Sequence, residues 1–153
     1  MLCSLLMTSG VLQESRLFSV AIERRLNHLP ILTLRARTKG ALDMETARSI
    51  LDMSAKFLNT NEEFNSLWDI REASVPSVEV TWACINWVVK KTKQLRKQNK
   101  RMAVLVPDSP PLRRIAQLAL KVAAVRCPSL ITANETEALA FIDAHSGSSV
   151  GVP

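Results

Sequence analysis

Apolar and polar residues alternate in two short segments near the start of the chain. Phe18–Ile22 and Leu32–Ala36 place apolar side chains at about every second position, which is typical of a strand with one buried face. Between them, Asn27–Pro30 has the residue types of a chain reversal. We therefore predict a β-hairpin that buries one of its faces.

Beyond Gly40 the pattern changes to helical spacing interrupted by short apolar runs. Asp43 is a predicted helix N-cap, and Asn134 is another. The uninterrupted apolar run Met102–Val106 is typical of a strand buried on both faces of a parallel sheet. In chain order the pattern predicts a helix over 43–59, a strand over 64–70, a helix over 77–99, a strand over 102–106, a helix starting at 108–110, a strand over 129–132 and a helix from 134.

The order of these elements, β-β-α-β-α-β-α-β-α, predicts an α/β fold. It favours a mixed, mostly parallel sheet of four to five strands with about four helices. The 153 residues are enough for one domain with its own apolar core. We place this domain at residues 15–145, with a flexible or packed N-terminal extension over 1–14 and a disordered tail over 146–153.

Composition narrows the function classes. The hydrophobic fraction of 47%, the charged fraction of 22% and the net charge of +6 are those of a globular protein with a basic surface. The cysteines, Cys3, Cys84 and Cys127, form no CxxC pair, which argues against a disulfide framework and against a zinc site. No apolar run is long enough for a transmembrane segment. We expect a cytoplasmic protein that binds no metal and no cofactor.

The sequence contains no pattern that predicts catalysis. His28 falls in the hairpin turn and His145 in the tail, so no motif places a histidine beside a serine or cysteine nucleophile. Asp69 follows an apolar strand, as the phosphate acceptor of a receiver domain does, but the other residues of a receiver site are missing. We therefore expect Asp69 to be structural and to bond loop amides. We assign no catalytic residue and expect that the chain is not an enzyme.

The predicted helix over 77–99 has two apolar faces. One stripe contains Val78, Trp82, Ile85 and Val89, and we expect it to face the sheet. The second row is rotated away from the first, so it is either buried inside the domain or exposed to a partner protein, with Trp87 as the expected anchor. The partner-interface residues predicted from this row are Val80, Cys84, Trp87 and Lys91.

The end of this helix is strongly basic, with seven basic residues between Lys90 and Arg101. They complement the helix dipole and solubilise the helix end, or they bind an acidic surface such as a protein or an anionic lipid. Nucleic acid is disfavoured, because no aromatic residues are interleaved with the basic ones. Arg113 opposes the dipole of the next helix, which points to an anion near Ser109. The residues assigned to the basic patch are Lys90, Lys93, Lys97, Lys100 and Arg101.

Three strings add to this element order: Ser66–Glu72, Arg101–Asp108 and Thr132–Ile142. Together they resemble the STAS family, in particular its SpoIIAA-like branch, often described as STAS/SEC14-like. The resemblance implies a non-catalytic domain that binds partner proteins and, in some members, nucleotides. Members switched by serine phosphorylation carry an Asp-Ser-Ser-Gly string, which is missing here. Ser77 is the nearest candidate phosphosite, and a role as helix cap is sufficient to explain it.

Three functions are compatible with the sequence. The first is a STAS-like regulatory domain that forms a homodimer and binds a protein through the second face of the long helix. The second is a module that binds a small apolar ligand or a lipid, as SEC14-like proteins do, and it requires an apolar pocket between sheet and helices. The third is weak association with an anionic surface through the basic helix end.

Overall fold

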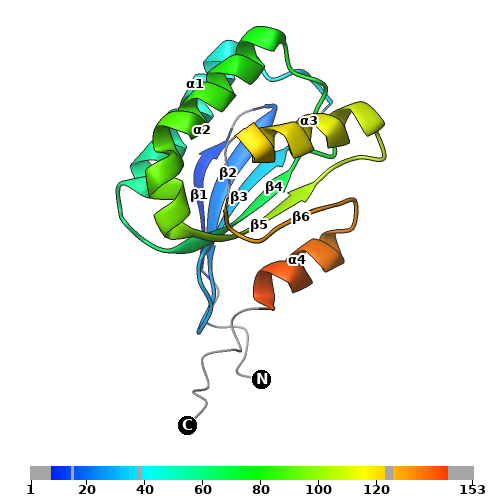
Figure 1. The fold of residues 1–153 in the computed structure, drawn as a ribbon. Helices are drawn as coiled ribbons and strands as arrows, with labels where there is room; N and C mark the ends of the chain where they lie inside the picture. Colours follow the sequence, from blue (N-terminus) through cyan, green and yellow to red (C-terminus); the bar gives the residue numbers. More distant parts are fainter. Residues whose placement is uncertain (1–7, 15, 38, 123–125, 145–153) are drawn as a thin grey trace.

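The centre of the protein is a six-stranded sheet. A computed structural model describes residues 8–14, 16–37, 39–122 and 126–144, and in it the strands follow one another across the sheet in chain order (Figure 1). The first three strands pair antiparallel, and the third to the sixth pair parallel. The strands are β1 (Thr8–Glu14), β2 (Phe18–Arg24), β3 (Ile31–Ala36), β4 (Phe64–Asp69), β5 (Asn99–Leu105) and β6 (Ser129–Thr132).

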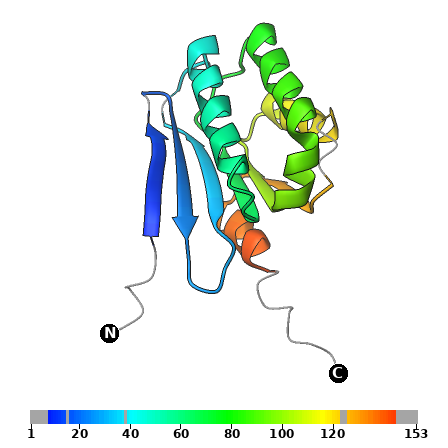
Figure 2. The same cartoon turned by 90° about the vertical axis from the view of Figure 1, so that its left-hand side faces the viewer.

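Helices cover both faces of this sheet. Three of them join the parallel strands and lie on one face, and the last helix lies on the other (Figures 1 and 2). The helices are α1 (Met44–Leu58), α2 (Val78–Gln98), α3 (Pro110–Val122) and α4 (Glu135–Asp143). The predicted α/β class with a mixed, mostly parallel sheet is confirmed.

The hairpin predicted from the alternating segments is confirmed. β2 pairs antiparallel with β3, with Phe18 opposite Ala36. The buried residues of β2 are Phe18, Val20 and Ile22, the alternation of a strand with one face on the core. The turn contains Asn27 at φ 61°, a left-handed conformation that asparagine adopts more readily than most residues.

The predicted helix starts are confirmed by their caps. Asp43 accepts a hydrogen bond from the backbone N–H of Thr46 at 2.6 Å, and Asn134 accepts one from the N–H of Glu137 at 3.2 Å. Both contacts satisfy backbone donors that the first turn of a helix leaves without an internal partner. These boundaries are therefore set locally.

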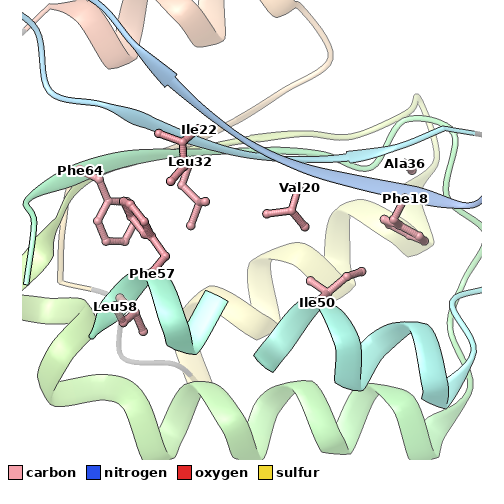
Figure 3. Close-up of a cluster of buried hydrophobic side chains, with 9 residues drawn as sticks. All are labelled: Phe18, Val20, Ile22, Leu32, Ala36, Ile50, Phe57, Leu58 and Phe64. Atoms are coloured by element: carbon pink, nitrogen blue, oxygen red, sulfur yellow. The ribbon is translucent and has the colours of Figure 1, made fainter. Parts of the chain in front are cut away.

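Apolar side chains pack on both faces of the sheet. On the α1 side, Phe57 and Phe64 meet edge to face with ring centroids 5.1 Å apart, inside the cluster that Figure 3 shows between α1 and strands β2–β4. On the α4 side a second cluster contains Ile31, Leu67, Ala103, Leu105, Ala138 and Ile142. The two clusters use opposite faces because successive side chains of a strand point to opposite sides.

The expected N-terminal extension is part of the sheet. Residues 8–14 form β1 and pair with β2, so the sheet has six strands instead of four to five, and this segment belongs to the domain instead of extending from it. The pairing register of β1 with β2 shifts between Val11 and Gln13. Apolar and polar residues alternate only weakly in this segment, so its strand conformation depends on pairing with β2. The expected tail over 146–153 lies outside the described residues.

Helix α2 has two apolar faces, and the face that contains Val80 packs on the core instead of the face that contains Val78. Val80 is only 3% exposed, whereas Val78 and Trp82 are 73% and 58% exposed. Trp87 packs against the cluster of Figure 3. The prediction that the stripe of Val78 and Trp82 faces the sheet is therefore wrong. Of the two alternatives left open for the row of Val80 and Trp87, the structure shows the one in which the row faces the inside of the domain. α2 contacts α1, α3 and β5, and these neighbours select its inward face, which periodicity cannot do when both faces are apolar.

Candidate functional site

A cavity of about 240 Å³ lies between the sheet and helices α1, α2 and α3. Its walls are mostly apolar: the sheet contributes Leu34, Phe64 and Trp68, and the helices contribute Ile50 and Val88 among others. An apolar cavity of about 150 Å³ is enough to hold a molecule the size of benzene. The space is therefore large enough for a small organic ligand.

Short side chains from four elements create this space. Ala47 of α1, Ser66 of β4, Cys84 of α2 and Ala119 of α3 all line the cavity. Each comes from an element that otherwise contributes longer apolar residues to the same layer. Protein interiors are normally packed without voids larger than a water molecule, so the space between these short side chains is unusual.

One polar pair in the cavity wall satisfies itself. Ser66 and Asn99 are both buried and both line the cavity. The Ser66 hydroxyl donates to Asn99 Oδ1 at 3.2 Å, and Asn99 Nδ2 donates to Ser66 Oγ at 2.9 Å. Because buried polar groups are costly when they lack partners, this pairing keeps the wall compatible with an apolar ligand.

The charged side chains that line the cavity are both cationic. They are Arg96, in the last turns of α2, and Arg126, shortly before β6. β5 and β6 are parallel neighbours. The segments that precede them therefore lie side by side at the amino-terminal ends of these strands, which we call this edge of the sheet. Both arginines are exposed, so the cavity reaches the protein surface at this edge and is positively charged there.

Two thiols also line the cavity, Cys84 and Cys127. Burial raises the pKa of both thiols above the ordinary cysteine value, because a low-dielectric environment disfavours the thiolate. A protonated, half-buried cysteine behaves as a small apolar side chain. The expectation that Cys84 is an unreactive core thiol agrees with this environment.

The predicted partner-interface row is mostly cavity wall. Val80, Cys84 and Trp87 line the cavity, and Lys91 is half-buried one turn further along α2. The alternative in which this row lies inside the domain therefore applies to these three residues, and the partner-interface alternative does not. The space between sheet and helices that the ligand-binding hypothesis requires is present, and three residues assigned to a protein interface belong to it.

The predicted basic patch is divided between two places. Lys90, Lys93 and Lys97 are exposed on α2, but α2 ends at Gln98, so the last two patch residues belong to β5. Lys100 pairs with Glu63 at 2.9 Å, and Arg101 donates to the Phe141 carbonyl at 2.6 Å while its guanidinium lies over the ring of the same residue. Lys100 Nζ also donates to the Lys97 carbonyl at 2.8 Å, so Lys100 stays next to the helical part of the patch, and only Arg101 turns away to α4.

The candidate anion and phosphorylation sites have ordinary structural roles. Ser77 is the N-cap of α2 and accepts a hydrogen bond from the Val80 N–H at 3.3 Å, as expected of a cap. Ser109 precedes α3, and its carbonyl accepts from the Arg113 N–H at 3.1 Å as part of the first turn. Arg113 itself is exposed. The structure brings none of the three into the cavity.

An ion-pair network lies at the carboxyl ends of β3 and β4, and the sequence did not predict it. Asp69 is buried and accepts two hydrogen bonds from the Arg71 guanidinium at 2.8 and 2.9 Å. It also pairs with Arg35 at 3.2 Å. Both arginines contact Glu135, the first residue of α4. No sequence signal joins residues so far apart, although the structural role predicted for Asp69 is confirmed by its hydrogen bond from the Arg71 backbone N–H at 3.3 Å.

The network contains two carboxylates and two guanidinium groups. Their interactions lower the pKa values of both carboxylates. Burial opposes ionisation of Asp69, but the hydrogen bonds from Arg71 and the charge of Arg35 outweigh burial, so the pKa of Asp69 is lowered. The hydrogen bond to Arg71 likewise lowers the pKa of Glu135. Paired charges with satisfied hydrogen bonds are typical of a structural clamp, here one that joins α4 to the carboxyl ends of β3 and β4.

Two further properties concern the described part of the chain only. Within it, no three His, Cys, Asp or Glu side chains come together in a way that could hold a metal ion. None of the helices described is both long and apolar enough to cross a bilayer.

Comparison with known proteins supports the fold. No protein-family model matches the sequence, and no curated protein matches it. Among solved structures, the chain is similar to an uncharacterized protein of the DUF3478 family from Shewanella loihica PV-4, which is described as having a SpoIIAA-like fold. The TM-score is 0.62 at 19% identity, and the match covers 85% of this chain and 98% of the other. At this identity the likeness concerns the fold alone: the chain has a SpoIIAA-like α/β fold, as the resemblance to the STAS family implied.

Proposed function

We propose that this chain is a non-enzymatic binding domain whose cavity holds a small apolar molecule with one anionic group, such as a medium-chain fatty acid. The observation that carries the proposal is the apolar cavity of about 240 Å³. At about 24 cal/mol per Å³, an empty cavity of 240 Å³ would cost an upper limit of about 6 kcal/mol. Whole domains are stable by only about 5–15 kcal/mol. A ligand that fills the cavity would therefore remove a cost that is large compared with the stability of the domain.

The lining supports the choice of an anionic group. Hydrocarbon side chains surround most of the cavity and suit an alkyl chain. Arg96 and Arg126 lie at one edge of it, and among the described residues no acidic side chain belongs to the lining. A guanidinium forms paired, charge-assisted hydrogen bonds with a carboxylate, so we infer that the ligand's carboxylate faces these two arginines.

The absence of catalysis is part of the same proposal. A nucleophilic cysteine needs a lowered pKa or a neighbouring base, and the pKa values of Cys84 and Cys127 are raised. His28 lies exposed in the β2–β3 turn and is not among the described residues that line the cavity with the two thiols. A protein partner bound through Val80 and Trp87 is not proposed again, because these side chains line the cavity.

Thermal unfolding of the full chain with added lipids tests the proposal. A ligand present at a hundred times its Kd stabilises the folded state by about 2.7 kcal/mol, which raises the Tm of a chain of this size by about 5–10 °C. We expect octanoate, laurate or palmitate to raise the Tm, and dodecanol to have a smaller effect than laurate. An unchanged Tm with every member of this series contradicts the proposal.

A cavity-filling variant provides the matched control. Ala119 lines the cavity from α3, whereas Ala140 is exposed on α4. Ala119→Phe should raise the Tm of the ligand-free protein and abolish the effect of laurate, because its ring occupies the ligand's space. Ala140→Phe should leave the laurate response unchanged. If Ala119→Phe instead destabilises the protein and laurate still binds, the ligand lies elsewhere.

A further inference from the structure

The outward face of α2 is apolar although it borders solvent. Among the described residues, large apolar side chains are exposed at seven positions, and five of these are on α2, on the segment just before it or on α3. They are Val75, Val78, Trp82, Val89 and Leu118. Isolated exposed apolar residues are common, but a group of them marks an interaction surface.

These α2 side chains form one continuous strip. Val78, Trp82, Ile85 and Val89 follow one another at intervals of four, three and four residues, so they share one side of the helix. The same spacing continues to Lys93 and Arg96. The strip is therefore apolar along the first half of α2 and basic toward its end, and we call it the α2 strip.

Charge is distributed unevenly over the molecule. α2 and α3 together contain eight basic residues and one acidic residue, whereas α4 contains three acidic residues and no basic one. α1 contains two of each sign. Because α4 lies on the other face of the sheet (Figures 1 and 2), the α2–α3 layer is the positively charged side of the protein.

The strip and the cavity share residues. Ile85 and Arg96 belong to the α2 strip and also line the cavity, and on α3 the exposed Leu118 follows the cavity-lining Ile115 by one turn. The cavity reaches the surface at Arg96, so a molecule that enters there passes the basic end of the α2 strip. The surface is thus continuous with the proposed binding site.

From these observations we propose that the α2 strip docks on an anionic membrane surface. A bilayer interface offers an apolar layer for Trp82 and Val89 and negative charge for Lys93 and Lys97, as in amphipathic interfacial helices. A second copy docked strip to strip would place basic residues against basic residues. The preference for a membrane over an acidic protein rests on the proposed function, because a membrane is also the source of an alkyl-chain ligand.

Vesicle co-sedimentation of the full chain tests the docking surface. We expect the protein to sediment with phosphatidylcholine vesicles that contain phosphatidylserine, and to do so less at high salt, which screens charge. Trp82→Ala should weaken partitioning about tenfold, because a buried aromatic side chain is lost from the interface. Leu26→Ala is the matched control, since Leu26 and Trp82 are both 58% exposed and Leu26 lies in the β2–β3 turn.

A charge pair provides the second arm. The double variant Lys93→Gln, Lys97→Gln should weaken binding roughly twenty-five-fold, at roughly fivefold per charge. The double variant Arg48→Gln, Lys56→Gln removes the same net charge from exposed positions of α1 and should have a much smaller effect. Equal effects of the two double variants, or no sedimentation of the wild-type chain, overturn the proposal.

The test separates docking from ligand binding. Trp82 does not line the cavity, so Trp82→Ala should keep the Tm response to laurate while it loses vesicle binding. Vesicle binding without any laurate response would contradict the proposed function and leave the docking surface valid. If the wild-type chain is a dimer in solution and Trp82→Ala is a monomer, the strip is an interface between copies and the membrane proposal is wrong.

Discussion

The α4 side of the sheet is filled with side chains, whereas the α1–α3 side encloses a cavity. On the α4 side, Ala103 and Ala138 are completely buried, and these small residues let the helix approach the sheet closely. On the other side, Ala47 and Ala119 are also small, but they line the cavity. Alanine therefore accompanies close packing under α4 and an open space under α1–α3.

This difference indicates a division of roles within one domain. The filled side contributes a cluster of buried apolar side chains, whose burial and close contacts stabilise the folded state. It is also joined to the sheet edge through Glu135 and the two arginines that contact it. The stability of that side allows the other side to keep a space that a ligand can occupy.

The sharpest test of this comparison removes the same side chain from each side. Ile142 on α4 is buried, and Ile115 on α3 is half-buried at the cavity. Ile142→Ala should lower the free energy of unfolding by about 4 kcal/mol, because it creates a new cavity in a filled layer. Ile115→Ala should cost about 1–2 kcal/mol, because its methyl groups already border empty space. Urea denaturation measures both, and equal costs would refute the difference in packing.

The second test loosens the clamp on the filled side. Asp69→Asn removes the charge that holds Arg71 and Arg35, and should lower the free energy of unfolding by about 2 kcal/mol at neutral pH. Because the pKa of Asp69 is lowered in the folded state, its contribution is present above the ordinary value of 3.8 and is lost as the pH falls through the lower folded value. Wild-type stability should therefore decrease more steeply in acid than that of Asp69→Asn, and parallel pH profiles would contradict this.

A smaller effect is expected at the start of α2, on the cavity side. Ser77→Ala removes the cap and should cost about 1 kcal/mol, whereas Ser77→Asp keeps a capping oxygen and should be nearly neutral. Ser74→Ala, at an exposed position nearby, is the control. Chemical denaturation compares the three variants. A Ser77→Asp variant with wild-type stability but altered vesicle or ligand binding would assign Ser77 a regulatory role beyond capping.

The smallest expected effect concerns the rate at which the cavity cysteines react, and it leaves the free energy of unfolding unchanged. Cys84 and Cys127 line the cavity, and their raised pKa values should make both slow to react with a maleimide at neutral pH. Laurate should slow the labelling of both further, because it occupies the space through which the reagent reaches them. Mass spectrometry of labelled peptides measures each site separately. Labelling that laurate does not change would show that the cavity is not the binding site.

The local signals of the sequence were sufficient for the order of the elements. Asp43, Ser77 and Asn134 cap the helices that they were expected to cap, and the apolar run Met102–Val106 covers most of β5. Residues 8–14 were the exception, because the conformation of an edge strand with weak alternation depends on its neighbour. Capping, turn chemistry and periodicity act over a few residues, so one sequence is enough to read them.

Tertiary structure decided which face of α2 became the wall of the cavity. Both faces of α2 are apolar, and only its contacts with α1, α3 and β5 turned Val80 inward and Trp82 outward. The cavity depends on short side chains from different elements that oppose one another across a gap, and the clamp joins Arg71 to Glu135 across 64 residues of sequence. Such features arise from distances between elements, which no local pattern in the sequence encodes.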